Sequence, residues 1–355
     1  MKVSLWGYYG FNYGDDIMLE IFMKIMEDND IEVVLVDYHN AGLINKEWGP
    51  RVKVIDYRNL SKTSKVLTLM KLATNMKLNF WGGGTVFTDT DNDGNFKSFF
   101  PLRVLGGRIG YVSVGVGLIN KRSRRIKTEL LLRLSSVVSM RDKHSYIYSK
   151  RLNQKTVSSS DITYSYFRSF KNNQKKIKEQ KYLLVSFRSL KGYFNQEEEN
   201  AIVQDVIDLI PHVYSKYNLE KVIFLPLDKK DIEVNSLIAS RTKQLIGENV
   251  EVSQESNVDI MTEIIRDSSI YISGRLHGSV ASEYFLNKTI TLSYSNKINF
   301  FYEQINHSFI DLLKENINFD KVDRILEEKR IENIEFSNNK ADVNETVLLD
   351  YILKK

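Results

Sequence analysis

The first half of the chain alternates two patterns of apolar and polar residues. Short, uninterrupted apolar runs rich in β-branched residues predict buried strands, and segments whose apolar residues recur three and four positions apart predict helices. The strands are expected at Lys2–Trp6, Ile31–Val36, Val52–Ile55, Leu78–Trp81, Ile109–Val114 and Ser136–Met140, with helices between most of them. Because alternating strands and helices produce parallel sheets covered on both faces, this half predicts a Rossmann-like domain.

The same alternation restarts after a polar, lysine-rich stretch over residues 158–181, which we interpret as a linker. Strands are expected at Tyr182–Phe187, Lys221–Leu225, Val250–Val252, Ile270–Ile272 and Thr289–Leu292, again separated by helical segments. The fold class predicted is therefore α/β, with two Rossmann-like domains facing across a cleft. Their expected ranges are 1–165 and 182–310, followed by C-terminal helices over 311–355.

Composition narrows the class of protein. With 355 residues, 42% apolar and 27% charged, the chain is typical of a globular protein of about two domains, and no apolar run is long enough to span a bilayer. The absence of cysteine excludes disulfides, cysteine-ligated zinc and thiol nucleophiles. The net charge of +5 favours acidic small molecules over nucleic acid. A cytoplasmic location is expected. The basic segments 121–127 and 171–181 permit peripheral contact with the inner face of a membrane, but a solvated surface is the commoner explanation of such segments.

Unusual polar residues and glycines follow the predicted strands, at the edge where open α/β sheets bind ligands. In the first half these segments are Gly7–Asp16, Gly82–Asp89 and Gly115–Gly117. In the second half they are Arg188, then Pro226 and Asp228, then Gly274-Arg275-Leu276-His277, then Tyr294, Asn296 and Lys297. The expected cleft therefore has glycines and carboxylates on one wall and cations on the other.

The segment Gly274–His277 joins a strand to a helix and predicts an anion site with a proton donor. A helix N-terminus favours anions, and Arg275 adds a planar fork suited to phosphate or carboxylate. His277 adds a group that exchanges a proton near neutral pH. Arg188 and Lys297 are further candidate cations.

Other motifs leave alternatives open. Asn12, Asp15 and Asp16 can equally cap the first helix or bind sugar hydroxyls. The run Gly82–Gly84 lacks the spacing of a dinucleotide site, so no nicotinamide cofactor is expected. Residues 89–94 imitate the start of a calcium loop, but Phe100 stands where that loop needs a carboxylate, and no metal is expected.

Six short motifs in order resemble the polysaccharide pyruvyl transferase family. They are Tyr8–Asp16, Gly82–Asp89, Gly115–Gly117, Ser139–Asp142, Gly274–His277 and Ser293–Lys297 followed by Phe300 or Phe301. The resemblance covers most of the chain and implies a fold like that of two-domain glycosyltransferases of the B type. It also implies transfer of pyruvate from phosphoenolpyruvate onto two sugar hydroxyls as a ketal, with release of phosphate and without a cofactor.

The resemblance places the family's donor-binding arginine and catalytic histidine at Arg275 and His277. The expected donor-binding set is Arg188, Arg275, Leu276, His277 and Lys297, and the expected acceptor-binding set is Asn12, Asp15, Asp16, Gly83, Gly84 and Asp89. The acceptor would be a sugar of a surface polysaccharide or of its lipid-linked precursor. Two alternatives remain: a nucleotide-sugar glycosyltransferase of the same architecture, and a non-catalytic glycan-binding relative.

Overall fold

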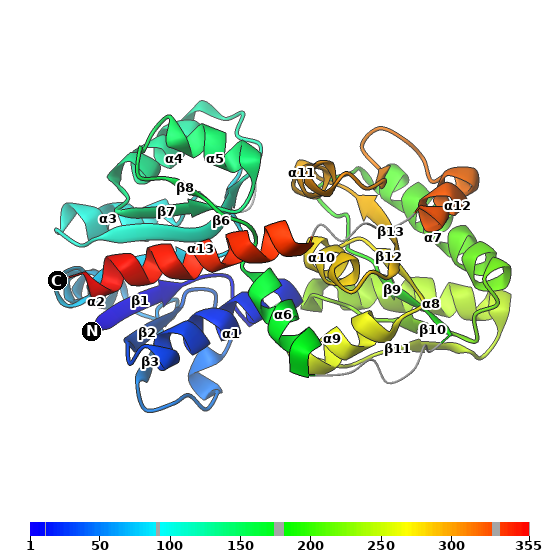
Figure 1. Cartoon of the computed structure of the whole chain (residues 1–355), viewed down its shortest axis with the longest axis horizontal. Coiled ribbons are helices and arrows are strands. Elements are labelled where there is room, and N and C mark those ends of the chain that lie inside the picture. Colours follow the sequence, from blue (N-terminus) through cyan, green and yellow to red (C-terminus); the bar gives the residue numbers. More distant parts are fainter. Residues whose placement is uncertain (11, 90–92, 174–180, 329–333, 355) are drawn as a thin grey trace. The chain divides into compact units, whose positions relative to one another are not determined.

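A computed structural model gives the fold (Figure 1). It describes residues 1–10, 12–89, 93–173, 181–328 and 334–354. The chain divides into two compact units. The first comprises Met1–Phe11, Asp15–Arg168 and Glu335–Lys355, and the second comprises Asn12–Gly14 and Ser169–Ile334.

The first unit contains a sheet in which every described pairing is parallel. Its order is β3-β2-β1-β4-β6-β7-β8, with β5 paired to β6. The strands are β1 (Lys2–Trp6), β2 (Glu32–Asp37), β3 (Val52–Asp56), β4 (Leu78–Gly82), β5 (Thr85–Phe87), β6 (Ile109–Val116), β7 (Val137–Met140) and β8 (Val157–Ser158). The helices of this part of the chain are α1 (Tyr13–Asp28), α2 (Lys62–Asn75), α3 (Phe96–Val104), α4 (Arg122–Leu134), α5 (Lys143–Lys150) and α6 (Thr163–Asn173), with a 3-10 turn at Leu43–Asn45.

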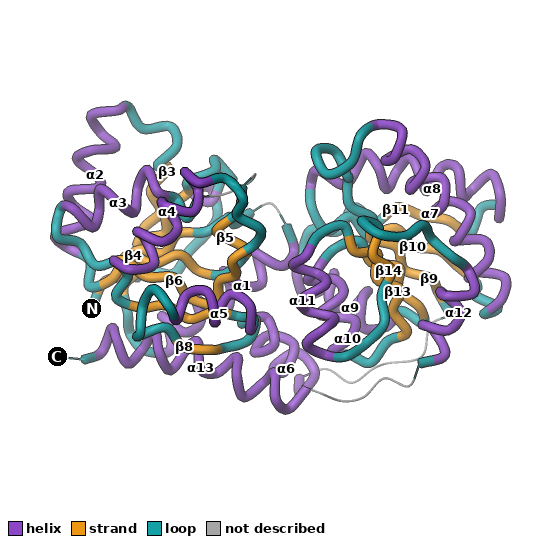
Figure 2. Tube along the Cα trace, turned by 90° about the horizontal axis from the view of Figure 1, so that it is seen from above, coloured by secondary structure: helices purple, strands orange, loops and turns teal. Residues whose placement is uncertain are grey.

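The second unit repeats this plan, with the parallel order β11-β10-β9-β12-β13-β14. Its strands are β9 (Tyr182–Ser186), β10 (Lys221–Phe224), β11 (Val250–Val252), β12 (Ile270–Ser273), β13 (Lys288–Ser293) and β14 (Ile310–Asp311). Its helices are α7 (Gln196–Lys216), α8 (Ile232–Ile246), α9 (Val258–Asp267), α10 (Leu276–Tyr284), α11 (Asn296–Ile305) and α12 (Phe319–Glu327), with a 3-10 turn at Lys229–Asp231. Figure 2 shows strands flanked by helices in each unit. Both sheets therefore have the Rossmann order, in which the chain starts at a central strand and reverses direction across the sheet.

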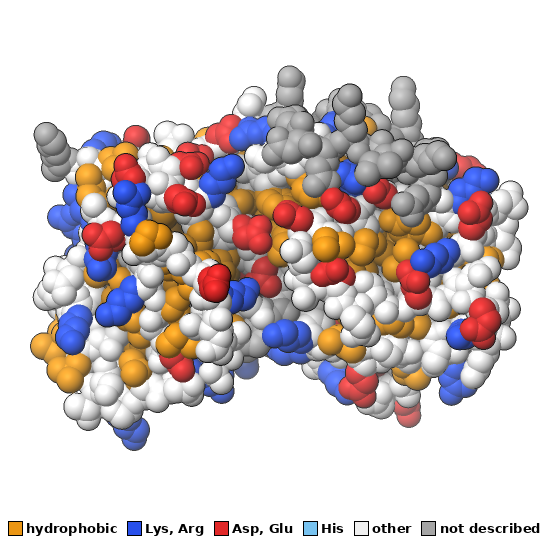
Figure 3. Space-filling view, turned by 90° about the horizontal axis from the view of Figure 1, so that it is seen from below, with side chains coloured by type: hydrophobic (Ala, Val, Ile, Leu, Met, Phe, Trp, Pro, Cys, Tyr) orange, Lys and Arg blue, Asp and Glu red, His pale blue; other side chains and the backbone are white. Residues whose placement is uncertain are grey.

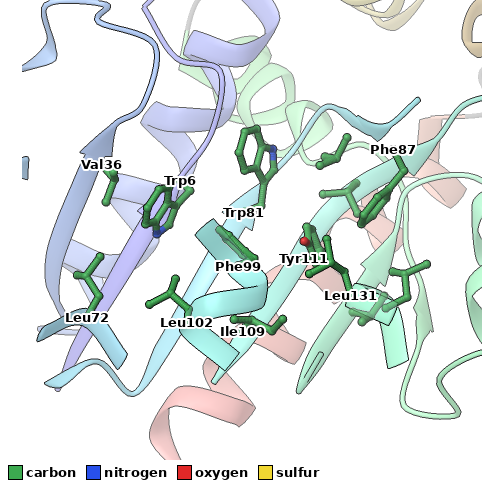
Figure 4. Packing of buried hydrophobic residues seen from close by; sticks show 14 of the residues in the cluster. Trp6, Val36, Leu72, Trp81, Phe87, Phe99, Leu102, Ile109, Tyr111 and Leu131 are labelled. Carbon is green, nitrogen blue, oxygen red and sulfur yellow. The ribbon is translucent and has the colours of Figure 1, made fainter. Parts of the chain in front are cut away.

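Aromatic rings dominate the core of the first unit (Figure 4). Trp6 lies edge-on to Phe99, with ring centroids 5.6 Å apart, and Trp81 and Tyr111 also contact Phe99, at 6.4 and 5.4 Å. These four rings come from β1, β4, β6 and α3. Because each buries a large apolar area and edge-to-face pairs add about 0.5–1.5 kcal/mol, this cluster fixes α3 against the sheet.

The helix and strand pattern predicted from the sequence is confirmed at nearly every element, but the ends of the two units differ from expectation. Residues 163–173 of the expected linker form α6, and residues 174–180 lie outside the described part. The stretch 311–355 is not a separate segment, because α12 belongs to the second unit and α13 (Ile334–Leu353) to the first from Glu335 onward.

Specific polar contacts explain why α13 belongs to the first unit. The buried Asn344 side chain accepts a hydrogen bond from Ser139 Oγ at 2.7 Å and donates one to the Ser160 carbonyl at 2.9 Å. Asp342 accepts two hydrogen bonds from the Arg168 guanidinium, at 2.6 and 2.9 Å. Such contacts depend on individual side chains rather than on apolar spacing, so the helical pattern alone did not reveal them.

Among the side chains coloured by type in Figure 3, Lys and Arg are interspersed with Asp and Glu. Within the part of the chain that the structure describes, no helix combines the length and apolar character that crossing a membrane requires.

Candidate active site

In the second unit, the order of the strands reverses between the adjacent strands β9 and β12. The loops that leave these strands diverge, and ligands of open α/β sheets bind at this point. Gly274, at the end of β12, lies so close to β9 that an added Cβ would be 3.2 Å from the backbone nitrogen of Arg188. The glycine therefore lets Arg188 and Arg275 leave neighbouring strand ends close together.

Arg275 is the N-cap residue of α10, and two carboxylates hold its guanidinium. Its Nε donates to Asp231 Oδ2 at 2.6 Å, and its Nη2 lies 3.1 Å from Asp228 Oδ2. The two aspartate side chains are only 1% and 6% exposed. Burial opposes the charge of Arg275, but Asp231, then Tyr294 and Asp228, outweigh it and raise its pKa above the ordinary value. The cation is thus permanent and fixed in orientation.

Arg188, directly beyond β9, lies against two tyrosine rings. Its Nη1 donates to the Tyr294 hydroxyl at 2.5 Å and its Nη2 to the Tyr193 hydroxyl at 3.2 Å. The guanidinium carbon is 4.6 Å from the ring centroid of Tyr294 and 4.9 Å from that of Tyr193. No carboxylate of the described residues forms an ion pair with Arg188, so its positive charge is not neutralised by an acidic neighbour.

Lys297, in the first turn of α11, shares Tyr294 with Arg188. Its Nζ is 5.6 Å from the centroid of that ring. Burial lowers the pKa of Lys297, and Arg188 and Arg275 lower it further, while Tyr294 opposes them. Like Arg188, Lys297 forms no ion pair with a carboxylate in the described ranges.

The pKa of the Tyr294 hydroxyl depends on three neighbouring cations. Its side chain is 1% exposed, and burial by itself would raise its pKa. Lys297, Arg188 and Arg275 together outweigh burial and lower the pKa to about 8. The cause is the attraction between the phenolate and these three cations, which exceeds the cost of burying a charge.

His277 is the second residue of α10 and is half-buried. Its imidazole packs against Gly14, since a Cβ added to that glycine would lie 1.8 Å from Nδ1 and 2.1 Å from Cγ. Leu276 precedes it with a side chain that is 7% exposed and belongs to the core of the second unit. The second unit therefore brings Arg188, Arg275 and Lys297 together and places His277 at the start of the helix that Arg275 caps. The expected donor-binding residue Leu276 is buried.

The residues expected on the acceptor side are divided between the units. Asn12 belongs to the second unit, where it forms a backbone bridge with Asp228. Asp15 and Asp16 belong to the first unit, and Asp16 Oδ1 accepts a hydrogen bond from the backbone of Gly10 at 2.5 Å. This contact ties Asp16 to the loop before α1; it is neither of the two roles that the sequence left open, helix capping and sugar binding.

The glycines of the first unit allow close packing. Gly83 and Gly84 have φ values of +78° and +80°, a conformation that favours glycine. A Cβ on Gly83 would be 1.9 Å from the sulfur of Met18, and one on Gly84 would be 3.4 Å from Asp15 Oδ1. The backbone of this turn consequently lies directly against the first two turns of α1.

Asp89 and its neighbours serve loop structure. The Asp89 carboxylate accepts hydrogen bonds from the backbone N–H groups of Asn120 and Lys121, the shortest at 2.6 Å. Asp93 forms ion pairs with Lys127 at 3.0 Å and Arg124 at 3.5 Å. Residues 90–92, between them, lie outside the described part of the chain.

The sequence did not assign Asp231, Tyr193 or Gly14 to this site; it placed Asp228 and Tyr294 at strand ends but gave neither a role. Asp228 and Tyr294 follow β10 and β13, so the rule that located Arg275 also pointed to them. The contact of Gly14 with His277 had no sequence signal, because the two residues are far apart in the chain.

Comparison with curated protein sequences gave no match. Among solved structures, the chain is similar to UDP-GlcNAc 2-epimerase from Methanocaldococcus jannaschii, with a TM-score of 0.65, 11% identity and 100% of both chains covered. It is also similar to MnaA of S. aureus solved with UDP (TM-score 0.67, 12% identity, 100% of this chain and 98% of that one). A third similar structure is a trehalose 6-phosphate synthase from Burkholderia multivorans (TM-score 0.54, 8% identity, 99% and 93% covered). At these identities the similarity concerns the fold, which is the α/β fold of the B-type glycosyltransferases and related epimerases.

The family comparison is more specific than the fold. The family described as polysaccharide pyruvyl transferase matches residues 12–296. The matched range begins at the segment that contacts His277 and ends one residue before Lys297, so it includes the ends of β9, β10, β12 and β13. The chain belongs to the polysaccharide pyruvyl transferase family.

Proposed function

We propose that the protein transfers pyruvate from phosphoenolpyruvate to two hydroxyls of one sugar, forming a ketal and releasing phosphate. The observation that carries this proposal is the presence of two cations, Arg188 and Lys297, that contact the same tyrosine and form no ion pair with a described carboxylate. Family membership supports the same reaction class.

The donor carries a phosphate and a carboxylate, and both need positive partners in a site with little water. Arg188 and Lys297 supply charges that a ligand can neutralise. Arg275, oriented by Asp228 and Asp231, supplies a third. Because these side chains supply the charge, the proposed reaction needs neither a metal nor another cofactor.

Proton transfer is the proposed role of His277. A proton is added to C3 of the donor while C2 gains positive character, and the first sugar hydroxyl attacks C2 and loses its own proton. The bond between C2 and the phosphate oxygen then breaks, the second hydroxyl attacks C2, and its proton leaves with the phosphate. Imidazole can give and take these protons near neutral pH.

The acceptor in this proposal is a sugar of a surface polysaccharide or of its lipid-linked precursor, encountered in the cytoplasm or at the inner face of the membrane. Asp15, Gly83 and Gly84 are the first-unit residues that we propose for hydroxyl binding, with Asp16 and Asp89 shaping the loops beside them. The further assignment of Asn12 is taken up below.

The test is release of inorganic phosphate from phosphoenolpyruvate in the presence of candidate glycans, with and without a chelator. His277→Ala should abolish release, whereas His144→Ala, which alters an exposed histidine of the first unit, should leave it unchanged. An unchanged rate in His277→Ala would contradict the mechanism, and loss of activity with the chelator would contradict its independence of metal.

A nucleotide-sugar glycosyltransferase is the second candidate, favoured by similar solved structures that contain UDP or UDP-GlcNAc. Thermal stabilisation by UDP, with none by phosphoenolpyruvate, would support this candidate. Glycan binding without phosphate release would instead support a non-catalytic relative.

A further inference from the structure

Residues 12–14, at the start of α1, are separate in sequence from the rest of the second unit but belong to it. The Tyr13 backbone N–H donates to the Leu227 carbonyl at 3.0 Å, and its hydroxyl is 2.8 Å from Thr262 Oγ1. Asn12 forms an antiparallel bridge with Asp228. These contacts fix the segment against the end of β10 and against α9.

The glycine in this segment is not explained by helix formation. Gly14 lies inside the first turn of α1, and its φ is outside the left-handed region. At such a position alanine stabilises a helix by about 0.5–1 kcal/mol relative to glycine. A side chain is excluded for another reason: a Cβ would lie 1.8, 2.1 and 2.6 Å from Nδ1, Cγ and Cε1 of His277, far inside van der Waals contact. The imidazole therefore rests directly on the Gly14 backbone.

The same segment is linked to Arg275. Asp228, the bridge partner of Asn12, also lies 3.1 Å from Arg275 Nη2. One short piece of backbone thus contacts the loop that orients the arginine and the ring of the histidine.

We propose that residues 12–14 position His277 and Arg275 for reaction, with Gly14 as the surface that sets the orientation of the imidazole. This inference rests on the proposed function for its catalytic meaning. It places Asn12 with the residues that organise the donor side, not with those that bind the acceptor. Gly14 acts through His277 and is a positioning residue.

The experiment is a cycle of Gly14→Ala and His277→Ala, alone and combined. Gly14→Ala should lower the melting temperature of the protein, because the methyl group displaces the imidazole. In the His277→Ala background the same change should leave the melting temperature unchanged or raise it, since the clash has gone. Gly49→Ala is the matched control, because a Cβ there meets no atom within 4 Å. If Gly14→Ala lowered the melting temperature equally with His277 present and with His277→Ala, the proposal would be overturned.

Two further measurements separate positioning from stability. In Gly14→Ala, phosphate release should fall by about 100-fold, the usual cost of misplacing a reacting group by ~1 Å, while the dissociation constant for phosphoenolpyruvate changes little. The ¹H–¹⁵N signals of the His277 ring, assigned with His277→Ala, should shift in Gly14→Ala and not in Gly49→Ala. Unshifted ring signals would overturn the inference. If the unaltered protein releases no phosphate, the proposed function fails, and the melting cycle and the ring signals still test the contact.

Discussion

Replacing Tyr294 with phenylalanine tests the electrostatic description of the site most directly. The variant keeps the buried ring and removes only the hydroxyl that accepts a hydrogen bond from Arg188 Nη1. In the unaltered protein the pKa of Tyr294 is about 8, against an ordinary value near 10. A spectroscopic titration of tyrosine ionisation at 295 nm should therefore contain one early step near pH 8, and that step should be missing from Tyr294→Phe.

The free energy that favours the Tyr294 phenolate follows from the size of its pKa shift. Two pKa units correspond to about 3 kcal/mol of preference for the phenolate, at about 1.4 kcal/mol per unit. Because the folded pKa lies below the unfolded value, this stabilisation is fully present above about pH 10 and disappears as the pH falls through about 8. The pKa of Lys297 is also shifted from its ordinary value, lowered by burial, so Lys297 contributes its own pH dependence to the free energy of unfolding. For that reason, the absorbance of tyrosine reports the ionisation of Tyr294 more selectively than the free energy of unfolding does.

Two variants sharpen the test. Lys297→Met removes one of the cations that lower the pKa of Tyr294, and should move the early step to higher pH. Tyr193→Phe removes the other hydroxyl bonded to Arg188 and should leave the step in place. Adding phosphoenolpyruvate should also move the step upward, because a bound anion opposes the phenolate charge. Identical titrations of the unaltered protein and Tyr294→Phe up to pH 9 would refute the reasoning.

Two other variants test the donor site and the first unit. Arg188→Met should weaken phosphoenolpyruvate binding, measured by calorimetry, by roughly 10- to 100-fold, which is the value of one charge-assisted hydrogen bond. The control Lys191→Met alters a 70% exposed lysine of the same loop and should not change the affinity. Equal affinities of the two variants would show that Arg188 does not bind the donor. Asn344→Ala should lower the free energy of unfolding by about 3 kcal/mol in urea, because Ser139 and Ser160 lose their buried partners. The exposed Asn339→Ala on the same helix should change it little, and an equal effect of the two variants would mean that the buried contacts do not anchor α13.

The sequence predicted the parallel sheets well because buried strands and amphipathic helices impose their own spacing. It did not reveal β8 and β14, which have two residues each and therefore no period to detect. The helix α11 was also missed, since its polar first turn, beginning at Asn296, was interpreted only as a ligand motif.

The sequence could predict those residues of the candidate site that directly follow a strand. Arg188, Arg275 and Lys297 follow β9, β12 and β13, and the structure brings all three to Tyr294. The pairing of Asp228 and Asp231 with Arg275 was not predicted, because choosing among the many carboxylates of the chain requires knowing which loops meet. The contact of Gly14 with His277 depends on how a distant segment packs, and no local pattern encodes it.

The membership of α13 in the first unit has a consequence for biosynthesis. Residues 169–334, which form nearly all of the second unit, are translated between Arg168 and the helix that provides Asn344. At ~5–20 residues per second, the ribosome needs roughly 10–30 s to produce that interval. During this time Ser139 and the Ser160 carbonyl lack their final partner. A nascent chain would therefore hold an incomplete first unit throughout synthesis of the second, and the first unit is completed only after Ile334, the last residue of the second, has been translated.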